Sequence, residues 1–231
     1  MCQEDFNYEP SMEEVARLFP LPNHVVFPHV LQPLHVFEPR YREMIQDAMQ
    51  GDRMIAMSLL EPGWEEDYEG RPPIFPTVCM CRIATCHQFD DGRYNLLAQG
   101  VCRARIVEEL SPSKQYREAK IEILHDHTSL DKIICHPQKR EKLVTYFRNL
   151  IPQIPEAQKQ FKELLKSDLG LGTLADIIAY TVDLDLTIKT DLLAEVDVDK
   201  RTDCLIQHLY QMQQPTKHGD NGEFPPEFSS N

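Results

Sequence analysis

The sequence is poor in glycine and tryptophan, and it has no long apolar run. Its 231 residues include 9 glycines and 1 tryptophan. No segment reaches the roughly 18 consecutive apolar residues of a membrane-spanning helix. The motif G-x-x-x-x-G-K-[ST], whose backbone N–H groups hold nucleotide phosphates, is also missing. We therefore expect no membrane span, and we assign no cofactor.

The sequence has fewer basic than acidic residues. The 24 lysines and arginines face 37 aspartates and glutamates, which gives a formal net charge of -13. Negative charge repels the phosphates of nucleic acids and of anionic lipids. Neither nucleic acid nor a membrane is therefore an expected partner. The first five residues are acidic, unlike the basic start of a secretory signal, and we expect a cytoplasmic protein.

Disulfides are not expected either. The chain has 7 cysteines, an odd number, and 42% of its residues are apolar. A chain of this length and composition buries a core without covalent crosslinks. Reduced thiols are the favoured interpretation.

The apolar pattern changes its period once along the chain. From about residue 136 the apolar residues recur at helical spacing, over 143–151, 161–165, 174–181 and 205–212. Before that point the runs are short or alternating, as is typical of strands, at 25–27, 34–37, 54–60, 78–87, 94–108 and 120–124. Strands followed by four or five helices, without alternation, predict an α+β fold.

Three local elements are predicted within the first half. Residues 40–49 carry apolar side chains at i, i+3, i+4 and i+7, which predicts a helix with Pro39 in its first turn. The turn sequence Asp-Asp-Gly-Arg at 90–93 predicts an antiparallel hairpin, because glycine accepts a positive φ. The sequence Ser-Met-Glu-Glu at 11–14 predicts the capped start of a short helix over 11–18.

Three stretches carry a distinctive motif. Residues 19–41 read FPLPNHVVFPHVLQPLHVFEPRY, residues 51–60 read GDRMIAMSLL, and residues 91–106 read DGRYNLLAQGVCRARI. These stretches resemble the N-terminal, substrate-binding domain of Lon proteases, over roughly residues 18 to 212. His29 stands where that family usually has glycine.

The resemblance implies a fold, a role and a set of boundaries. The fold is a PUA-like β pseudo-barrel followed by a C-terminal helical bundle. The role is the recognition of unfolded or misfolded polypeptide by a bacterial, stand-alone form without ATPase and peptidase domains, with Lon protease as a candidate partner. The expected parts are an N-terminal extension (1–18), the β-rich subdomain (19–125), the helical bundle (126–212) and a flexible tail (213–231). The oligomeric state is not implied.

The motif residues themselves are expected to be structural. Pro39 suits the first turn of a helix, Glu38 suits its positive end, and Tyr41 starts a buried stripe. Arg40 is expected to pair with a carboxylate across the barrel. The residues assigned to this structural set are Pro28, Leu34, Phe37, Glu38, Pro39, Arg40, Tyr41, Asp52, Arg53, Gly92 and Tyr94.

Two groups have the side chains of a metal site. They are Cys79, Cys81, Cys86 and His87 in one, and His125, Asp126, His127, Cys135 and His136 in the other. On a strand Cys79 and Cys81 point to one face and Cys86 to the opposite face, so the thiols converge only if a bulge intervenes. The second group falls at the junction of the two parts, where solvated or capping histidines are common. We therefore predict no metal.

A hydrolase of unknown substrate is one open alternative, and a PUA-like RNA-binding protein is another. Ser113-Lys114 and Lys166-Ser167 are neighbours in sequence, but adjacency does not bring a nucleophile and a base together, and no glycine-rich elbow accompanies them. We assign no catalytic residue, and the favoured interpretation is a non-catalytic polypeptide-binding protein.

The segment 61–76 is the candidate peptide-binding loop. Its prolines, glycines and acids disfavour a strand, and it carries Trp64, Tyr68 and Phe75. Large aromatic rings with an acidic rim suit apolar or basic peptide segments. The alternative is that these rings only cover one end of the barrel.

Overall fold

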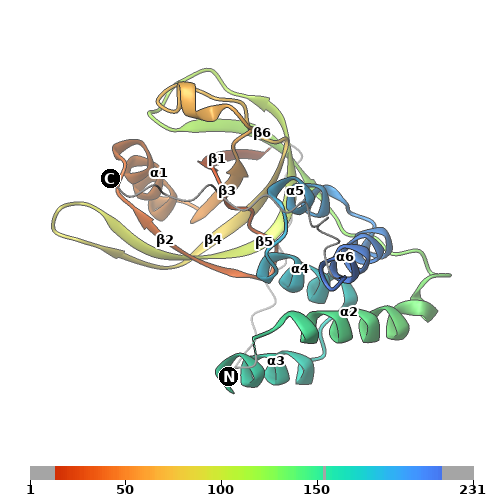
Figure 1. The fold of residues 1–231 in the computed structure, drawn as a ribbon. Helices are drawn as coiled ribbons and strands as arrows, with labels where there is room; N and C mark the ends of the chain where they lie inside the picture. Colours follow the sequence, from red (N-terminus) through yellow and green to blue (C-terminus); the bar gives the residue numbers. More distant parts are fainter. Residues whose placement is uncertain (1–13, 153–154, 215–231) are drawn as a thin grey trace, which may run out of the picture.

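The structure is a computed structural model that describes residues 14–152 and 155–214. Within these ranges six strands come first, interrupted by one α-helix and a short 3-10 helix (Trp64–Asp67). A second 3-10 helix (Ile133–Cys135) and five α-helices follow, which confirms the α+β prediction. In Figure 1 the curled sheet lies beside the helices α2 to α6. The elements are β1 (Glu14–Leu21), β2 (Leu31–Val36), α1 (Pro39–Gln50), β3 (Met54–Leu59), β4 (Thr77–Gln88), β5 (Tyr94–Glu109), β6 (Arg117–Leu124), α2 (His136–Leu150), α3 (Pro155–Lys166), α4 (Leu171–Thr181), α5 (Leu186–Ala194) and α6 (Val198–Met212).

The sheet has the order β2-β5-β4-β3-β1-β6, with a further pairing of β5 with β6. One half of β5 pairs with β2 and the other half with β6, so the sheet curls back on itself as a pseudo-barrel. It is not a closed barrel, because β2 stays at an edge. All pairs are antiparallel except β1 with β3.

The predicted hairpin and the predicted helix both form. β4 and β5 pair antiparallel around Gly92, whose φ is 83°. Helix α1 begins at Pro39 and buries Tyr41, Met44, Ile45 and Ala48. Met49 ends that expected stripe and lies in the last turn of the helix, but it is 37% exposed.

Two predictions for the first thirty residues are wrong. Residues 14–18 form strand β1 rather than a helix, since Ala16 and Leu18 point into the barrel while Val15 is exposed, a period of two. The sheet thus begins before residue 19. Residues 25–27 are buried but form no strand; Pro22 and Pro28 bracket them and lack the N–H that a ladder needs.

The remaining calls on the termini lie outside the described residues. They concern residues 1–13 of the expected extension and helix, and residues 215–231 of the expected tail. The division into subdomains at residue 125 stays a prediction. Within the described ranges, no helix combines the length and the apolar character that crossing a membrane requires.

His29 adopts the left-handed conformation that glycine favours. Its φ is 69°, and its N–H donates to the Gly100 carbonyl oxygen at 2.9 Å. Histidine tolerates this region better than most residues. Gly100 is needed for a different reason, because a Cβ there would lie 2.1 Å from the carbonyl oxygen of Phe27.

Two apolar clusters fill the molecule. The smaller one lies inside the pseudo-barrel and uses alternate residues such as Ala16, Leu18, Val78 and Met80. The larger one joins the outer face of the sheet to α1 and to the helices α2 to α6. The barrel interior is therefore filled by side chains rather than open to a ligand.

Buried ion pairs join the sheet to the helices. Arg103 on β5 donates from Nη2 to Asp176 Oδ1 on α4 at 2.5 Å and from Nε to the Leu193 carbonyl oxygen at 2.9 Å. Arg201 on α6 places Nε 3.1 Å from the same Asp176 oxygen and also binds Asp126. Burial raises the pKa of the Asp176 carboxyl, and the two arginines oppose that rise. These contacts fix the helices against the barrel.

Candidate functional site

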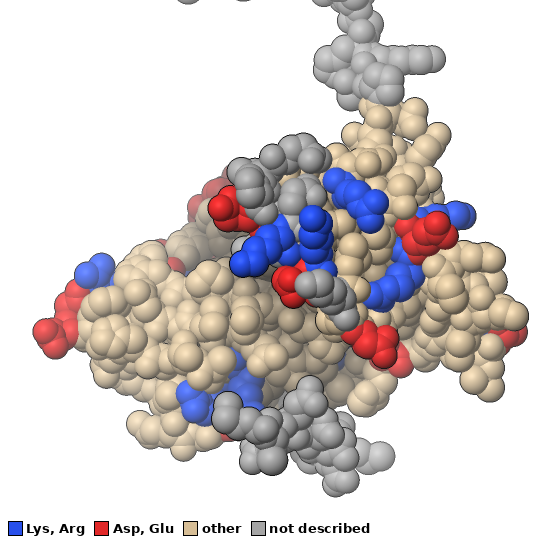
Figure 2. All heavy atoms as spheres, turned by 90° about the horizontal axis from the view of Figure 1, so that it is seen from below, with Lys and Arg blue, Asp and Glu red and all other residues tan. Residues whose placement is uncertain are grey.

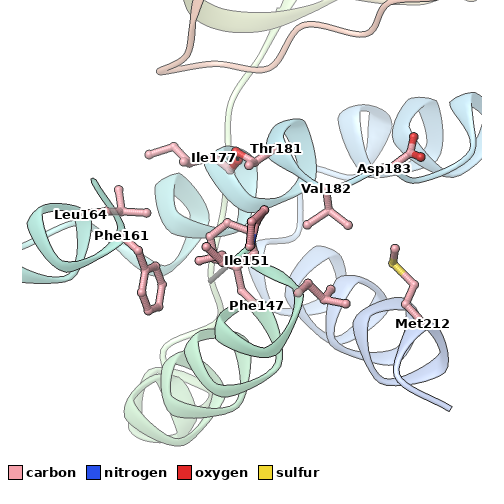
Figure 3. A pocket seen from close by; sticks show the side chains of 11 residues that line it. Phe147, Ile151, Phe161, Leu164, Ile177, Thr181, Val182, Asp183 and Met212 are labelled. Atoms are coloured by element: carbon pink, nitrogen blue, oxygen red, sulfur yellow. Dashed lines mark hydrogen bonds between the residues drawn. The ribbon is translucent and has the colours of Figure 1, made fainter. Parts of the chain in front are cut away.

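An apolar pocket of about 560 Å³ opens among the helices. Its size lies within the range of ligand pockets. Residues of α2, α3, α4 and α6 line it, and Figure 3 shows their side chains around it. The described residues that line this helix pocket are Phe147, Leu150, Ile151, Pro152, Phe161, Leu164, Ile177, Thr181, Val182, Asp183 and Met212.

The apolar stripes of α2 and α4 continue into the residues that follow each helix. Pro152 cannot continue α2, so Ile151 turns to an extended conformation with ψ 132° and points its side chain at the cavity. Helix α4 also ends in an extended residue, Val182, with ψ 144°. Both residues line the cavity.

Two aromatic rings form the floor of the helix pocket. The rings of Phe147 on α2 and Phe161 on α3 meet edge to face with centroids 5.7 Å apart. Each is only 5% exposed. Met212 at the end of α6 is 42% exposed and lies at the rim. The floor is thus fixed by packing, while the rim is open to a ligand.

The lining offers contact surface and little chemistry. The Thr181 hydroxyl already donates to the Ile177 carbonyl oxygen at 2.7 Å. The exposed Asp183 is the one ionisable residue among the described lining residues. Such a lining suits burial of apolar side chains, with a preference for a positive charge beside them.

The candidate loop 61–76 brings together two of its three aromatic residues. The rings of Trp64 and Tyr68 have centroids 5.4 Å apart and are half-buried. Phe75 instead packs against the larger core, with its N–H donating to the Leu59 carbonyl oxygen at 2.9 Å. Its position suits the alternative role of covering the barrel, and peptide binding by the three residues stays a prediction.

The family motif holds this loop in place. The Tyr68 hydroxyl donates to Glu38 Oε1 at 2.7 Å, and Arg40 Nε donates to Glu38 Oε2 at 3.0 Å. The prediction that Arg40 pairs across the barrel is therefore wrong, because its carboxylate partner is two residues away. The Arg40 guanidinium also lies 4.9 Å from the centre of the Tyr68 ring. Burial and the bond to Glu38 raise the pKa of the Tyr68 phenol. Glu38 precedes α1, but its side chain makes no hydrogen bond to the helix N-terminus, since Arg40 and Tyr68 take its oxygens.

The other motif residues range from buried to exposed. Pro28, Tyr41 and Tyr94 are buried, Leu34 packs against the core, and Asp52 accepts from Arg17 at 2.7 Å. Arg53 adopts a left-handed backbone conformation, with a φ of 63°.

Phe37 differs from its motif neighbours because it is 59% exposed. Leu31 on β2 is 52% exposed on the same edge of the sheet. The His35 ring lies between them in sequence, 6.2 Å from the Phe37 ring. Figure 2 shows a broad surface without charged side chains extending towards the β4–β5 hairpin, beside helices that carry both signs of charge. This surface was not predicted.

In the first metal candidate, Cys86 lies on the same side of β4 as the other two cysteines. Cys86 packs against the same core cluster as Cys79 and Cys81, because the register shifts between Ile83 and Thr85. The prediction that Cys86 lies on the opposite face is therefore wrong. Cys79 and Cys81 have sulfurs 3.9 Å apart, and burial raises the pKa of the Cys79 thiol. Such thiols are poor ligands and nucleophiles.

The second metal candidate is dispersed. His127 faces Asp197 at 4.0 Å, whereas His136 faces Asp199 at 3.5 Å. Burial alone would raise the pKa of the Asp199 carboxyl, but Lys139 and His136 hold it below its ordinary value. Across the described ranges, no three histidines, cysteines, aspartates or glutamates are grouped as a metal would require.

The Ser113-Lys114 pair forms no catalytic dyad. The Ser113 hydroxyl donates to Glu118 at 3.1 Å, while Lys114 Nζ donates to Asp47 at 2.8 Å. The Ser167 hydroxyl donates to the Leu164 carbonyl oxygen at 2.5 Å. Each group is thus satisfied by a different partner.

A family model describes nearly the whole of this architecture. Residues 15–211 match the model of the ATP-dependent protease La (LON) substrate-binding domain. The chain belongs to the LON substrate-binding domain family. It therefore carries a Lon-like substrate-recognition domain, and the resemblance noted in the sequence motifs is confirmed.

Relatives and solved structures agree with this assignment. The chain is 28% identical to a Lon protease of Dictyoglomus thermophilum, over 90% of this chain and 26% of that protein, and 29% identical to Lon protease 2 of Myxococcus xanthus, over 86% and 24%. It thus spans about a quarter of these bacterial relatives. Its fold is similar to the N-terminal domain of a Mycobacterium avium complex Lon protease, with a TM-score of 0.66 and 17% identity. The match covers 85% of this chain and 98% of that domain. The fold is also similar to that of a Lon N-terminal domain protein of Xanthomonas campestris, with a TM-score of 0.59 and 19% identity. That match covers 84% of this chain and 98% of the Xanthomonas chain.

Proposed function

We propose that this chain binds unfolded or misfolded polypeptide without catalysing a reaction, and that the helix pocket takes apolar side chains of the bound segment. The observation that carries this proposal is the apolar lining around a cavity of about 560 Å³. Unfolded chains expose the leucine, isoleucine and phenylalanine side chains that such a cavity buries. Burial of one such side chain contributes about 1.5–3 kcal/mol, which suits weak and sequence-tolerant capture.

The loop at Trp64 is proposed as a second contact. Its two half-buried rings offer rigid apolar area next to Glu65, Glu66 and Asp67, which are all exposed. Aromatic rings of this kind lose little conformational freedom on binding. A bound segment with basic residues would then find acidic side chains at the loop and at Asp183.

The proposed cellular role is that of an adaptor or regulator in protein quality control. It rests on membership of the family and on relatives that are named Lon protease. Lon protease is the proposed partner, and the cytoplasm is the proposed location. Retention of purified Lon protease on this immobilised chain supports the adaptor role. Absence of both retention and any change in Lon turnover of a model substrate contradicts it.

Polypeptide binding is tested with a reduced and alkylated, permanently unfolded protein that carries a fluorescent label. Met212→Arg places a charged side chain at the rim of the helix pocket, and we expect it to weaken binding by about 10–100-fold, the equivalent of one buried side chain. Val107→Arg is the matched control, because it adds the same charge at Val107, which is 63% exposed on β5, away from the pocket.

The outcomes are distinct. Wild-type affinity in the control together with loss in Met212→Arg supports the pocket. Equal affinity in both variants contradicts it. The single tryptophan then reports on the second contact, since a segment that touches the loop changes Trp64 emission and a segment confined to the helix pocket does not.

A further inference from the structure

A short segment before α2, which ends in the 3-10 helix Ile133–Cys135, presents three large aliphatic side chains to solvent. Leu130 and Ile134 are 86% and 81% exposed, the highest values for large apolar residues in the part of the chain that the structure describes, and Ile133 is 47% exposed. Exposed clusters of this kind mark interaction sites. We refer to Leu130, Ile133 and Ile134 as the apolar loop.

The apolar loop is held in a defined position. Within it, the Lys132 N–H donates to the Ser129 carbonyl oxygen and the Cys135 N–H to the Lys132 carbonyl oxygen, both at 2.9 Å. Lys132 Nζ lies 3.5 Å from Asp197 at the start of α6. The backbone of His127 adds bonds to Val196 and Val198 at 3.0 Å each. The side chains are therefore presented on an ordered support.

The apolar loop and the helix pocket lie at opposite ends of α2. That helix has 15 residues, which corresponds to a length of about 22 Å. The loop precedes its N-terminus, whereas Phe147, Leu150 and Ile151 at its C-terminal end line the pocket. In Figure 1 the loop projects from the end of α2 that lies away from α3. The loop thus cannot reach the pocket of its own molecule.

Charge restricts where two copies can meet. Each copy carries a formal net charge of -13, so two copies repel one another over most of their surface. The loop contributes Asp131 and Lys132 and is neutral overall, and the pocket lining contributes the single carboxylate of Asp183. Both surfaces are mainly apolar and carry little charge.

We propose that the chain associates with itself head to tail, the apolar loop of one copy entering the helix pocket of the next. Because the two surfaces differ, the contact repeats from copy to copy instead of closing as a two-fold dimer. The contact occupies the pocket to which the proposed function assigns polypeptide, so bound polypeptide and self-association exclude each other.

The test uses one variant of each surface in the full chain. Ile134→Asp changes the loop and leaves the pocket intact, whereas Met212→Arg changes the pocket and leaves the loop intact. Val107→Asp is the control for an added charge at an exposed aliphatic position. Sedimentation velocity is measured over a wide range of concentrations. Wild type and Val107→Asp are expected to grow in mass with concentration, and each of the other two variants is expected to stay monomeric alone.

The decisive sample is an equal mixture of Ile134→Asp and Met212→Arg. One intact loop and one intact pocket remain in the mixture, so it should form dimers and nothing larger. Monomeric wild type, a mixture that stays monomeric, or growth of either variant alone would overturn the proposal. Leu130→Asp and Thr181→Arg, both at exposed positions, replace any variant that does not fold.

A second readout separates this proposal from the proposed function. Ile134→Asp should bind the labelled unfolded protein as wild type does at low concentration, and excess unfolded protein should dissociate wild-type assemblies. If Ile134→Asp binds no polypeptide while the mixture still forms dimers, the proposed function fails and the self-association stands. Assemblies that persist with polypeptide bound would contradict a shared pocket.

Discussion

Replacing Asp176 by asparagine probes how the helices are fixed to the barrel. Its Oδ1 lies 2.5 Å from Arg103 Nη2 and 3.1 Å from Arg201 Nε. The side chains of Asp176, Arg103 and Arg201 are 1%, 3% and 1% exposed. The change keeps the shape of the side chain and removes the fully buried negative charge that both guanidinium groups contact. Asp126, which is 33% exposed, is then the carboxylate that remains beside them.

The expected loss follows from burial. Breaking a buried ion pair by removing one partner costs about 3–5 kcal/mol. Asp126 still supplies a charge to both arginines, so we place the loss in the free energy of unfolding at the lower end, about 3 kcal/mol. For a chain of this size that corresponds to a fall of roughly 6–12 °C in Tm.

Urea and thermal unfolding followed by circular dichroism measure this loss. The matched control is Glu122→Gln, which removes the carboxylate of an exposed ion pair with Arg105. The side chains of Glu122 and Arg105 are 54% and 55% exposed. Such pairs contribute under about 1 kcal/mol. If Asp176→Asn is no less stable than Glu122→Gln, the buried pairs do not hold the helices to the barrel.

Three further predictions concern the backbone, pH and thiols. Gly100→Ala should lower the free energy of unfolding by about 1–3 kcal/mol, because its Cβ meets the Phe27 carbonyl oxygen; an unchanged urea midpoint would refute this. Burial raises the pKa of Asp199, but its lysine and histidine neighbours lower it below the ordinary value. Its stabilisation is present above the unfolded pKa near 3.9 and is lost as pH falls through the lower folded pKa. The deficit of Asp199→Asn in urea unfolding should therefore shrink below about pH 4, and a constant deficit contradicts the assignment. Alkylation mapped by mass spectrometry should modify the exposed Cys135 before Cys79, whose thiol pKa burial raises; equal rates would show that Cys79 is accessible.

Periodicity predicted the elements that bury one face. Helix α1 and the hairpin of β4 and β5 follow from local spacing and turn chemistry, and so do the stripes of α2, α4 and α6. Strand β1 was missed because residues 11–14 also suit a helix start, and its partners β3 and β6 are distant in sequence. Helix α5 has apolar residues on more than one side, such as Leu192 and Leu193, and therefore no clear stripe.

The site was less predictable than the fold. The stripes named Phe147, Ile151, Phe161 and Ile177 as apolar, but a sequence pattern cannot distinguish a side chain that packs from one that lines a cavity. The cavity depends on where α2 and α4 end relative to α3 and α6, which is a tertiary property. The signal available in the sequence was Pro152, which ends α2 while its apolar stripe continues.

Cys86 illustrates a similar limit. Its face depends on one register shift in β4, and a single inserted residue moves every later side chain to the other side. The sequence around it carries no glycine or proline that marks the irregularity. Alternation alone thus gave the wrong face.

The most direct test of the central claim is to map where a bound polypeptide touches the protein. An unfolded model peptide with a photoreactive apolar side chain is crosslinked to the full chain, and the attachment sites are identified by mass spectrometry. We predict attachment at the rim and walls of the helix pocket, at Met212, Leu164 and Ile177, with the peptide's unmodified counterpart competing. Attachment confined to Leu31, Phe37 or the loop at Trp64, with none in the helix pocket, would contradict the account.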